Sequence, residues 1–204
     1  MTNGYPEILT RAFEAANGNL IQTAFFHLRA SQAASGAVEK TELINKKDEI
    51  ISLTNFADLG GYWFYDIKPE NYIGEGAEQK VYLCEDGKSV IKTNDTIFYA
   101  SWYEYLINLL IHNILFPNTA YNLLGFYQEN DSFFAVVKQS FIASTEPTDL
   151  AKLHNFLVQS GFTHKRNNDY FHKELGIILE DLHDENVLTN HGEFFFIDSA
   201  IYLM

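Results

Sequence analysis

The feature that most constrains the fold is a short hairpin near the middle of the chain. "QKVYLC" and "SVIKT" are apolar-rich runs of strand length, and "EDGK" with its Asp86-Gly87 pair joins them. An Asp-Gly pair between such runs is a strong local signal for a β-hairpin, because it suits the positive φ angles of a tight turn. The sequence therefore predicts antiparallel strands over residues 79–84 and 89–93.

Elements on both sides of the hairpin extend this pattern to an α+β fold. Apolar spacings predict helices over 6–17, from 19 onward, over about 39–54, over 97–115 and over about 148–159. Further strands are predicted over 122–129, 132–139, 176–179, 187–189 and 193–198. We predict one main domain over 66–204, preceded by a helical segment over 1–65 that the Gly60-Gly61 pair terminates.

Charge and cysteine content exclude several classes of function. The 27 acidic and 14 basic residues give a formal net charge of −13, which argues against a nucleic-acid or anionic-lipid partner held through phosphate contacts. Cys84, the single cysteine, excludes an intramolecular disulfide and a cysteine-based zinc site, and we expect a buried structural thiol. The N-terminus lacks a signal-peptide pattern and the apolar stretch 106–116 is too short to span a bilayer, so we expect a cytoplasmic protein without a membrane partner.

Two loops compete as the place of chemistry, because each has an asparagine five residues after an aspartate. The first is "DIKPEN", from Asp66 to Asn71, and the second is "DLHDEN", from Asp181 to Asn186. Residues 1–60 read as helices throughout, so no glycine-rich hairpin or strand lysine precedes Asp66. We therefore interpret "DIKPEN" as a polar approach to the first strand, in which Pro69 restricts the preceding residue to extended geometry.

The stretch upstream of Asp181 has both features that Asp66 lacks. Gly74 and Gly76 form a glycine-rich turn between two strands, where backbone N–H groups can approach phosphates; an ordinary turn is the alternative. Lys92 follows on an apolar strand, where its cation could pair with phosphate oxygens; a solvent-facing edge lysine is the alternative.

The next helix carries a carboxylate on its apolar stripe. Glu104 interrupts a stripe formed by Ile97, Ala100, Ile107, Ile111 and Ile114. An unpaired buried carboxylate costs several kcal/mol, so we predict a pair between Glu104 and Lys92, unless Glu104 escapes at the edge of the stripe.

A second hairpin follows Asp181. Pairing of 187–189 with 194–197 through "NHG" brings Asn186 and Asp198 to the same end of that hairpin. Two oxygen ligands together with nucleotide phosphates suit Mg²⁺. Asp181 could orient or deprotonate an attacking hydroxyl; three solvated polar groups in loops are the alternative.

These residues, in this order, resemble the protein-kinase fold. "DLHDENVL" followed by "FIDSA" is similar to the motifs of aminoglycoside and choline kinases, and residues 71–204 resemble the compact kinase-like domain of polyvalent proteins of phages and mobile elements. The resemblance implies a minimal two-lobed fold, with an antiparallel N-lobe sheet and helix over 66–138, a hinge over 139–143 and a reduced C-lobe over 144–204.

The resemblance also implies ATP and Mg²⁺ as cofactors, and a role for each candidate residue. The implied roles are catalytic for Lys92, Glu104 and Asp181, nucleotide-binding for Gly74, Gly76, Lys92 and Gln139, and metal-binding for Asn186 and Asp198. Gln139 would belong to an adenine-binding hinge together with Lys138 and Ser140.

Departures from the kinase pattern leave more than one function open. Leu179 and Glu180 replace the His-Arg of the protein-kinase signature, and only five residues follow Ser199, without an activation loop. The first hypothesis is an ATP-dependent phosphotransferase that acts on a small molecule, on itself or on a protein partner. The second is an inactive kinase-like module that binds nucleotide or protein, and the third is an interaction domain whose motif matches are accidental.

Overall fold

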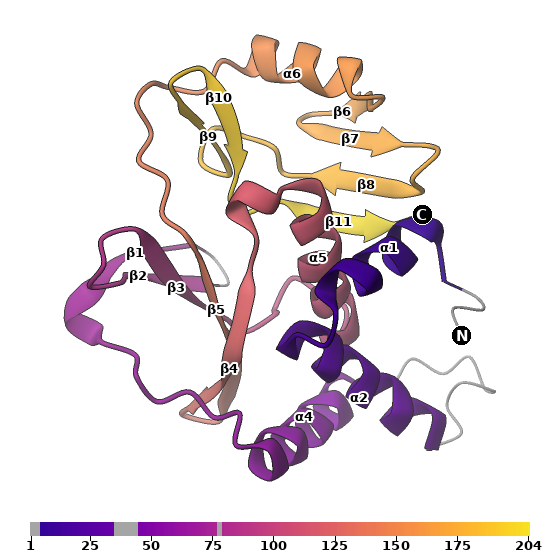
Figure 1. Cartoon of the computed structure of the whole chain (residues 1–204), viewed down its shortest axis with the longest axis vertical. Coiled ribbons are helices and arrows are strands. Elements are labelled where there is room, and N and C mark those ends of the chain that lie inside the picture. The colour runs from indigo at the N-terminus through magenta and orange to yellow at the C-terminus, as the bar shows by residue number, and fades with distance from the viewer. Residues whose placement is uncertain (1–4, 35–44, 77–78) are drawn as a thin grey trace. The chain divides into compact units, whose positions relative to one another are not determined.

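The computed structural model describes residues 5–34, 45–76 and 79–204. The chain divides into two compact units. The sheet unit contains residues 16–109 and 121–141, and the C-terminal unit contains residues 1–15, 110–120 and 142–204. The division falls within the helix α5, which contributes residues to both units (Figure 1).

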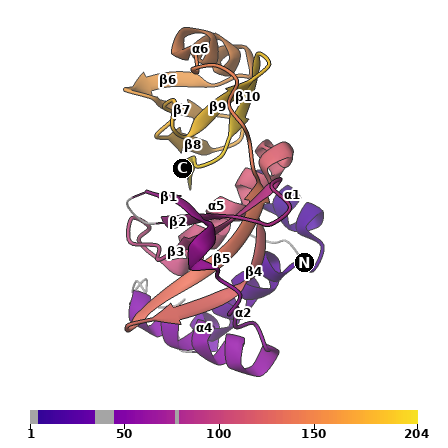
Figure 2. The ribbon, with the colours of Figure 1, turned by 90° about the vertical axis from the view of Figure 1, so that its left-hand side faces the viewer.

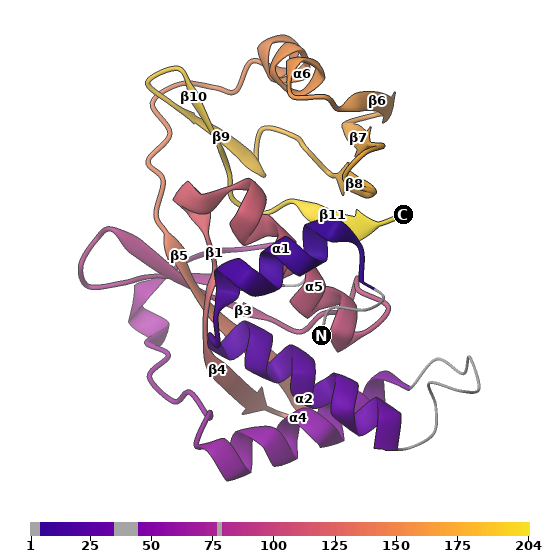
Figure 3. The same ribbon diagram turned by 45° about the vertical axis from the view of Figure 1, so that its right-hand side comes forward.

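The helices α2 (Leu20–Ala34) and α4 (Lys46–Gly60) lie at the start of the sheet unit. They lie side by side, as Figure 3 shows. The His27 ring of α2 hydrogen-bonds to the Ser52 carbonyl of α4 at 3.0 Å. α4 begins where the Asn45 side chain accepts a hydrogen bond from the Lys47 N–H, and it ends at Gly61, whose φ of 68° is the left-handed conformation that glycine tolerates.

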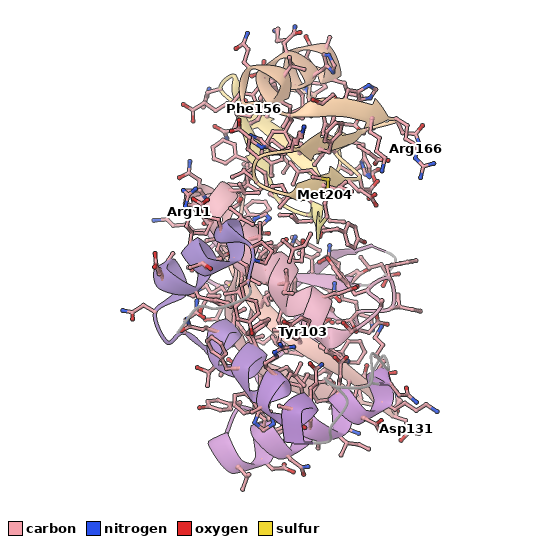
Figure 4. All side chains as sticks on the ribbon, turned by 90° about the vertical axis from the view of Figure 1, so that its right-hand side faces the viewer. Arg11, Tyr103, Asp131, Phe156, Arg166 and Met204 are labelled. Atoms are coloured by element: carbon pink, nitrogen blue, oxygen red, sulfur yellow. The ribbon has the colours of Figure 1, made fainter. Side chains whose placement is uncertain are left out.

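A five-stranded antiparallel sheet follows, in the order β1-β2-β3-β5-β4 (Figure 2). Its strands are β1 (Tyr72–Glu75), β2 (Gln79–Leu83), β3 (Ser89–Asn94), β4 (Asn122–Glu129) and β5 (Ser132–Ser140). Gly87 takes a φ of 62° in the predicted β2–β3 turn, and Val81 faces Lys92 across the hairpin. Asn130 and Asp131, the latter labelled in Figure 4, both take positive φ in the β4–β5 turn.

Residues 62–64 extend this sheet with a short parallel bridge along β4. The Phe126 N–H donates to the Tyr62 carbonyl at 2.8 Å, and the Phe64 N–H donates to the Phe126 carbonyl at 2.7 Å. Gly125 has a φ of 151°, and a Cβ at this position would lie 2.2 Å from the Tyr62 carbonyl oxygen. The bridge therefore requires glycine at position 125.

The helix predicted over 97–115 is shorter than expected at its N-terminal end. α5 runs from Trp102 to Leu115 and is followed by the 3-10 turn η2 (Pro117–Thr119). Thr96 has a φ of 61°, and the Asn94 side chain accepts the Thr96 N–H at 2.7 Å. This side chain gives the backbone a local alternative to helix, which explains the later start.

The described part of the C-terminal unit combines helical segments with two small sheets. It contains most of α1 (Glu7–Ala16), the end of α5, η2 and α6 (Leu150–Gln159), which Asp149 caps at its N-terminus. A four-stranded sheet has the order β11-β8-β7-β6, and Figure 1 shows α6 beside β6. Its strands are β6 (Thr163–Arg166), β7 (Asp169–His172), β8 (Ile177–Glu180) and β11 (Ala200–Leu203).

The second sheet of this unit is the predicted hairpin around "NHG". β9 (Val187–Asn190) pairs with β10 (Glu193–Phe196), with Val187 opposite Phe196. His191 and Gly192 take positive φ in the turn. The Ile197 N–H also donates to the Asn186 carbonyl at 2.9 Å, so the pairing continues to the end where Asn186 and Asp198 lie.

The α+β class and the antiparallel sheets are confirmed, and several details are not. The sequence did not predict β6, β7 or β11, and the third helix continues to residue 60 instead of ending near 54. The predicted start of that helix, near residue 39, lies outside the described residues. Cys84 is half-buried rather than buried, and partial burial raises the pKa of its thiol. None of the helices within the described ranges combines the length and the hydropathy needed to cross a membrane.

Candidate functional site

The glycine-rich turn joins β1 to β2 in the sheet unit. Gly74 lies opposite Val81, and the Gly76 N–H donates to the Gln79 carbonyl at 2.8 Å. Neither glycine has a left-handed φ; among the described residues, a Cβ on Gly74 would meet no atom within 4 Å, and one on Gly76 would meet only the Gln79 side chain, at 3.7 Å. Neither the packing nor the backbone conformation therefore requires glycine at these two positions, in contrast to Gly125.

Lys92 lies on β3, between β2 and β5. Its side chain is buried, with 4% exposure, so the alternative of a solvent-facing lysine is wrong. The ammonium nitrogen lies 5.7 Å from the centre of the Tyr121 ring, within the range of a cation–π interaction. A buried cation in the middle of a sheet requires compensating negative charge or dipoles, which is consistent with an anion site.

Glu104 lies in the first turn of α5. The predicted buried stripe is wrong at its N-terminal end, because Ile97 and Ala100 precede the helix and are exposed, and Glu104 itself is half-buried. The Glu104 Oε2 accepts the Ala100 N–H at 3.1 Å, and the Glu104 N–H donates to the Ser101 Oγ at 3.0 Å. This reciprocal arrangement is close to a capping box. The pair between Glu104 and Lys92 stays a prediction.

The proposed hinge residues lie at the end of β5. Gln139 is buried, with 2% exposure, and faces Val90 of β3. Lys138 forms an ion pair with Asp86 at 3.6 Å, and the Phe141 N–H donates to the Lys88 carbonyl at 2.9 Å. These contacts attach the end of β5 to the β2–β3 turn. Their part in adenine binding stays a prediction.

The loop after β8 carries Asp181 in the C-terminal unit. Asp181 adopts a φ of 65°, which is uncommon for a residue other than glycine and occurs preferentially at functional sites. Leu182, with 1% exposure, anchors the loop in the core, while Asp181 is exposed to solvent. The loop therefore presents a carboxylate on a strained but anchored backbone.

Two side chains of the same loop hold the Asp181 carboxylate. The Asn186 Nδ2 donates to the Asp181 Oδ2 and to the Asp181 carbonyl, both at 2.9 Å. The His183 Nδ1 accepts the Glu185 N–H at 3.2 Å, and the Asn186 Nδ2 lies 3.2 Å from the His183 Nε2. His183 Nε2 lies 3.2 Å from the Asp181 Oδ1. Both carboxylate oxygens are thus oriented before any substrate binds.

Asn186 and Asp198 are the residues predicted to bind Mg²⁺. Because the Asn186 amide nitrogen is used by Asp181, its Oδ1 is the atom left to coordinate a cation. Asp198 follows β10, at the same end of the hairpin as Asn186. Within the described part of the chain, no three His, Cys, Asp or Glu side chains gather as a metal site. A magnesium ion would therefore need oxygens from a phosphate ligand as well.

The comparison with protein families decides the classification. A model of the family described as "Serine/Threonine/Tyrosine Kinase found in polyvalent proteins" (Kinase-PolyVal) matches residues 46–204. The chain belongs to the Kinase-PolyVal family. A comparison with curated proteins found no match.

Membership in the Kinase-PolyVal family confirms the kinase-like domain expected from the sequence. The match begins at Lys46, so it includes α4, the five-stranded sheet and the parts of the C-terminal unit over 110–120 and 142–204, but not α1 or α2. The boundaries proposed within 66–204 stay a prediction, as does the similarity to aminoglycoside and choline kinases. The roles of the individual site residues likewise stay predictions.

The competing loop "DIKPEN", residues 66–71, forms the approach to β1 in this Kinase-PolyVal chain. Residues 69–71 form the 3-10 turn η1 (Pro69–Asn71) directly before β1, and Lys68 is extended and ion-paired with Glu85. Asp66 and Asn71 line a pocket of about 210 Å³ together with the end of β2. This segment leads into the first strand, in the manner that the interpretation of Pro69 requires.

The sequence did not predict the contacts that three residues make at the candidate site. Ser101 caps α5, and the "SWYE" spacing from Ser101 to Glu104 was the available signal. His183 orients Asp181 from two residues away, and no sequence pattern indicates this. Glu49 of α4 binds the first turn of α5, although 53 residues separate it from Trp102.

Proposed function

We propose that this chain is an ATP- and Mg²⁺-dependent phosphotransferase. One observation carries the proposal: Asp181 presents a solvent-exposed carboxylate on a left-handed backbone, and Asn186 and His183 orient both of its oxygens. A left-handed φ alone does not mark a reactive loop, since Asn130 and Asp131 share it in a hairpin turn; Asp181 differs from them because neighbouring side chains hold both of its carboxylate oxygens. The family membership supports the kinase class independently of this geometry.

The chain's own residues would divide the work as follows. Asp181 would accept the proton of an acceptor hydroxyl while that oxygen bonds to the γ-phosphorus, and the bond to the β-phosphate oxygen breaks to leave ADP. Lys92 would neutralise phosphate oxygens from its buried position on β3. Asn186 Oδ1 and Asp198 would hold Mg²⁺, which would supply the charge that stabilises the transferred phosphoryl group.

The two glycines around the end of β1 support nucleotide binding. Gly74 and Gly76 have neither a steric nor a conformational reason of their own to be glycine. Close approach of the backbone to phosphates would explain glycine at both positions, because a Cβ there would contact the ligand. Gln139 would contribute to the adenine-binding hinge.

The family description points to the acceptor class. Its words "Serine/Threonine/Tyrosine" name hydroxyl side chains, so we propose a protein hydroxyl, on this chain or on a partner, ahead of a small molecule. A second candidate function is nucleotide binding without transfer. One observation favours it: the Glu104 carboxylate accepts the Ala100 N–H of its own helix start.

Thermal unfolding with nucleotide tests the proposed function first. ATP or ADP with Mg²⁺ should raise the unfolding midpoint of the wild type, because a ligand that binds the native state stabilises it by mass action, and the shift should be lost in Asp198→Ala. Transfer of labelled phosphate from ATP should then be abolished in Asp181→Asn. Binding without transfer would favour the second function, and no shift at millimolar nucleotide would overturn both.

A further inference from the structure

The start of α5 is held by a second helix of the sheet unit. Every α-helix begins with backbone N–H groups that have no partner inside the helix. In α5 the Trp102 N–H donates to the Glu49 Oε2 of α4 at 2.7 Å, and the Tyr103 N–H also stabilises that carboxylate. The Glu104 N–H is satisfied by Ser101. A carboxylate from another element thus caps the positive end of the helix dipole.

Burial of the Glu49 carboxylate for this contact costs desolvation free energy. The side chain is only 2% exposed, and burial is the largest influence on its carboxyl, raising the pKa. The N–H groups of Trp102 and Tyr103 and the charge of Lys46 oppose this rise, whereas the nearby Glu104 carboxylate adds to it. A side chain buried at this position must have its acceptor oxygens satisfied, and the N–H groups of Trp102 and Tyr103 do this.

The same turn of α4 also holds the loop that precedes α5. The Lys46 ammonium donates to the Thr96 carbonyl and, at 2.9 Å, to the Tyr99 carbonyl. On another side of α5, Tyr103, labelled in Figure 4, packs against Phe25 of α2 with ring centres 4.7 Å apart. One turn of α4 therefore fixes both the loop and the helix start, two residues before Glu104.

We propose that Glu49, with Lys46, is a positioning residue of the phosphotransfer site: it fixes the first turn of α5 and thereby the place of Glu104 relative to Lys92. This inference rests on the proposed function and identifies α4 as an element through which that function can be controlled. Glu49 touches no reacting atom. It acts through the helix that carries Glu104.

Amide hydrogen exchange tests the structural part of this proposal without any need for activity. Glu49→Ala should accelerate exchange over residues 102–105 at least tenfold, whereas Asp48→Ala, an exposed carboxylate in the same turn, should not. Glu49→Gln keeps an acceptor oxygen and should largely restore protection. Unchanged exchange in both Glu49 variants would overturn the proposal. If Glu49→Ala does not fold, Lys46→Met with Lys47→Met as control gives the same comparison.

Kinetics tests the functional part. ATP turnover is measured with Mg²⁺ and normalised to the amount of protein that binds nucleotide. In Glu49→Ala, kcat should fall at least fivefold below the wild-type value, while KM for ATP stays within threefold of it. Glu49→Gln should recover most of the lost kcat. A merely structural residue would leave the normalised kcat at the Asp48→Ala value, which would overturn the positioning role. A wild type without turnover would overturn the proposed function instead, while exchange would still decide whether Glu49 fixes α5.

Discussion

Two glycines of the same sheet should respond in opposite ways to alanine. Gly125 has a φ of 151° and lies against the Tyr62 carbonyl, where a Cβ would come within 2.2 Å. Backbone strain of this kind costs about 1–3 kcal/mol. The two hydrogen bonds between residues 62–64 and Phe126, which must move, contribute about 1 kcal/mol each. Gly125→Ala should therefore destabilise the fold by about 3–5 kcal/mol.

Chemical denaturation measures this loss directly, and thermal unfolding should show a midpoint lowered by roughly 6–20 °C for a chain of this size. Gly74→Ala is the matched substitution, since no atom of the described residues lies within 4 Å of its Cβ position. Its stability should stay within about 1 kcal/mol of the wild type, because alanine costs a strand little and removes unfolded-state entropy. It should nevertheless lose the stabilisation by ATP and Mg²⁺.

These two variants distinguish a glycine that the fold requires from a glycine that nucleotide binding requires. A loss below about 1 kcal/mol in Gly125→Ala would show that the 62–64 bridge adapts and that the steric reasoning is wrong. Gly74→Ala that binds ATP as tightly as the wild type would remove the glycine-rich turn from the nucleotide site.

Three further perturbations have defined outcomes. Burial raises the pKa of Glu49 above its ordinary 4.5, so its protonated carboxyl stabilises the fold fully below pH 4.5. This contribution should be lost as pH rises through the raised pKa. Urea denaturation at a series of pH values should show the resulting fall in the free energy of unfolding, and Glu49→Gln should lack it. Hydrogen bonds from the Ser89 hydroxyl and, to a smaller extent, from the Lys88 N–H lower the pKa of Asp86 to about 2. The stabilising contribution of Asp86 should therefore be present above pH 3.8 and lost as pH falls through about 2. NMR titration should find this pKa, and Ser89→Ala should raise it. Leu182→Ala should cost about 2–5 kcal/mol by denaturation, because the side chain is buried, whereas the exposed Leu150→Ala should cost less than about 1 kcal/mol.

Local signals predicted the parts of the fold that local chemistry determines. The Asp86-Gly87 turn, the stop at Pro117 and the "NHG" turn all lie where the sequence places them, because positive φ and a missing N–H are properties of single residues. β6 could not be predicted, because its sequence carries no such local signal. All four of its residues are exposed, so no alternation of apolar and polar side chains marks it as a strand.

The two carboxylates near the start of α5 show where such reasoning fails at the site. Glu104 attracted attention because it interrupted an apolar stripe, yet that stripe began five residues too early, and a capping box accounts for the contacts of its carboxylate in this structure. Glu49 attracted none, because an acidic residue inside the helix predicted over about 39–54 has an ordinary explanation as a charge on the solvated face. Its actual contact is with another helix, and only tertiary packing brings Trp102 to it. A carboxylate near a helix start therefore has two explanations, one local and one tertiary, and its burial decides between them: a carboxylate that serves only its own helix can remain in water, whereas one at 2% exposure must have partners elsewhere.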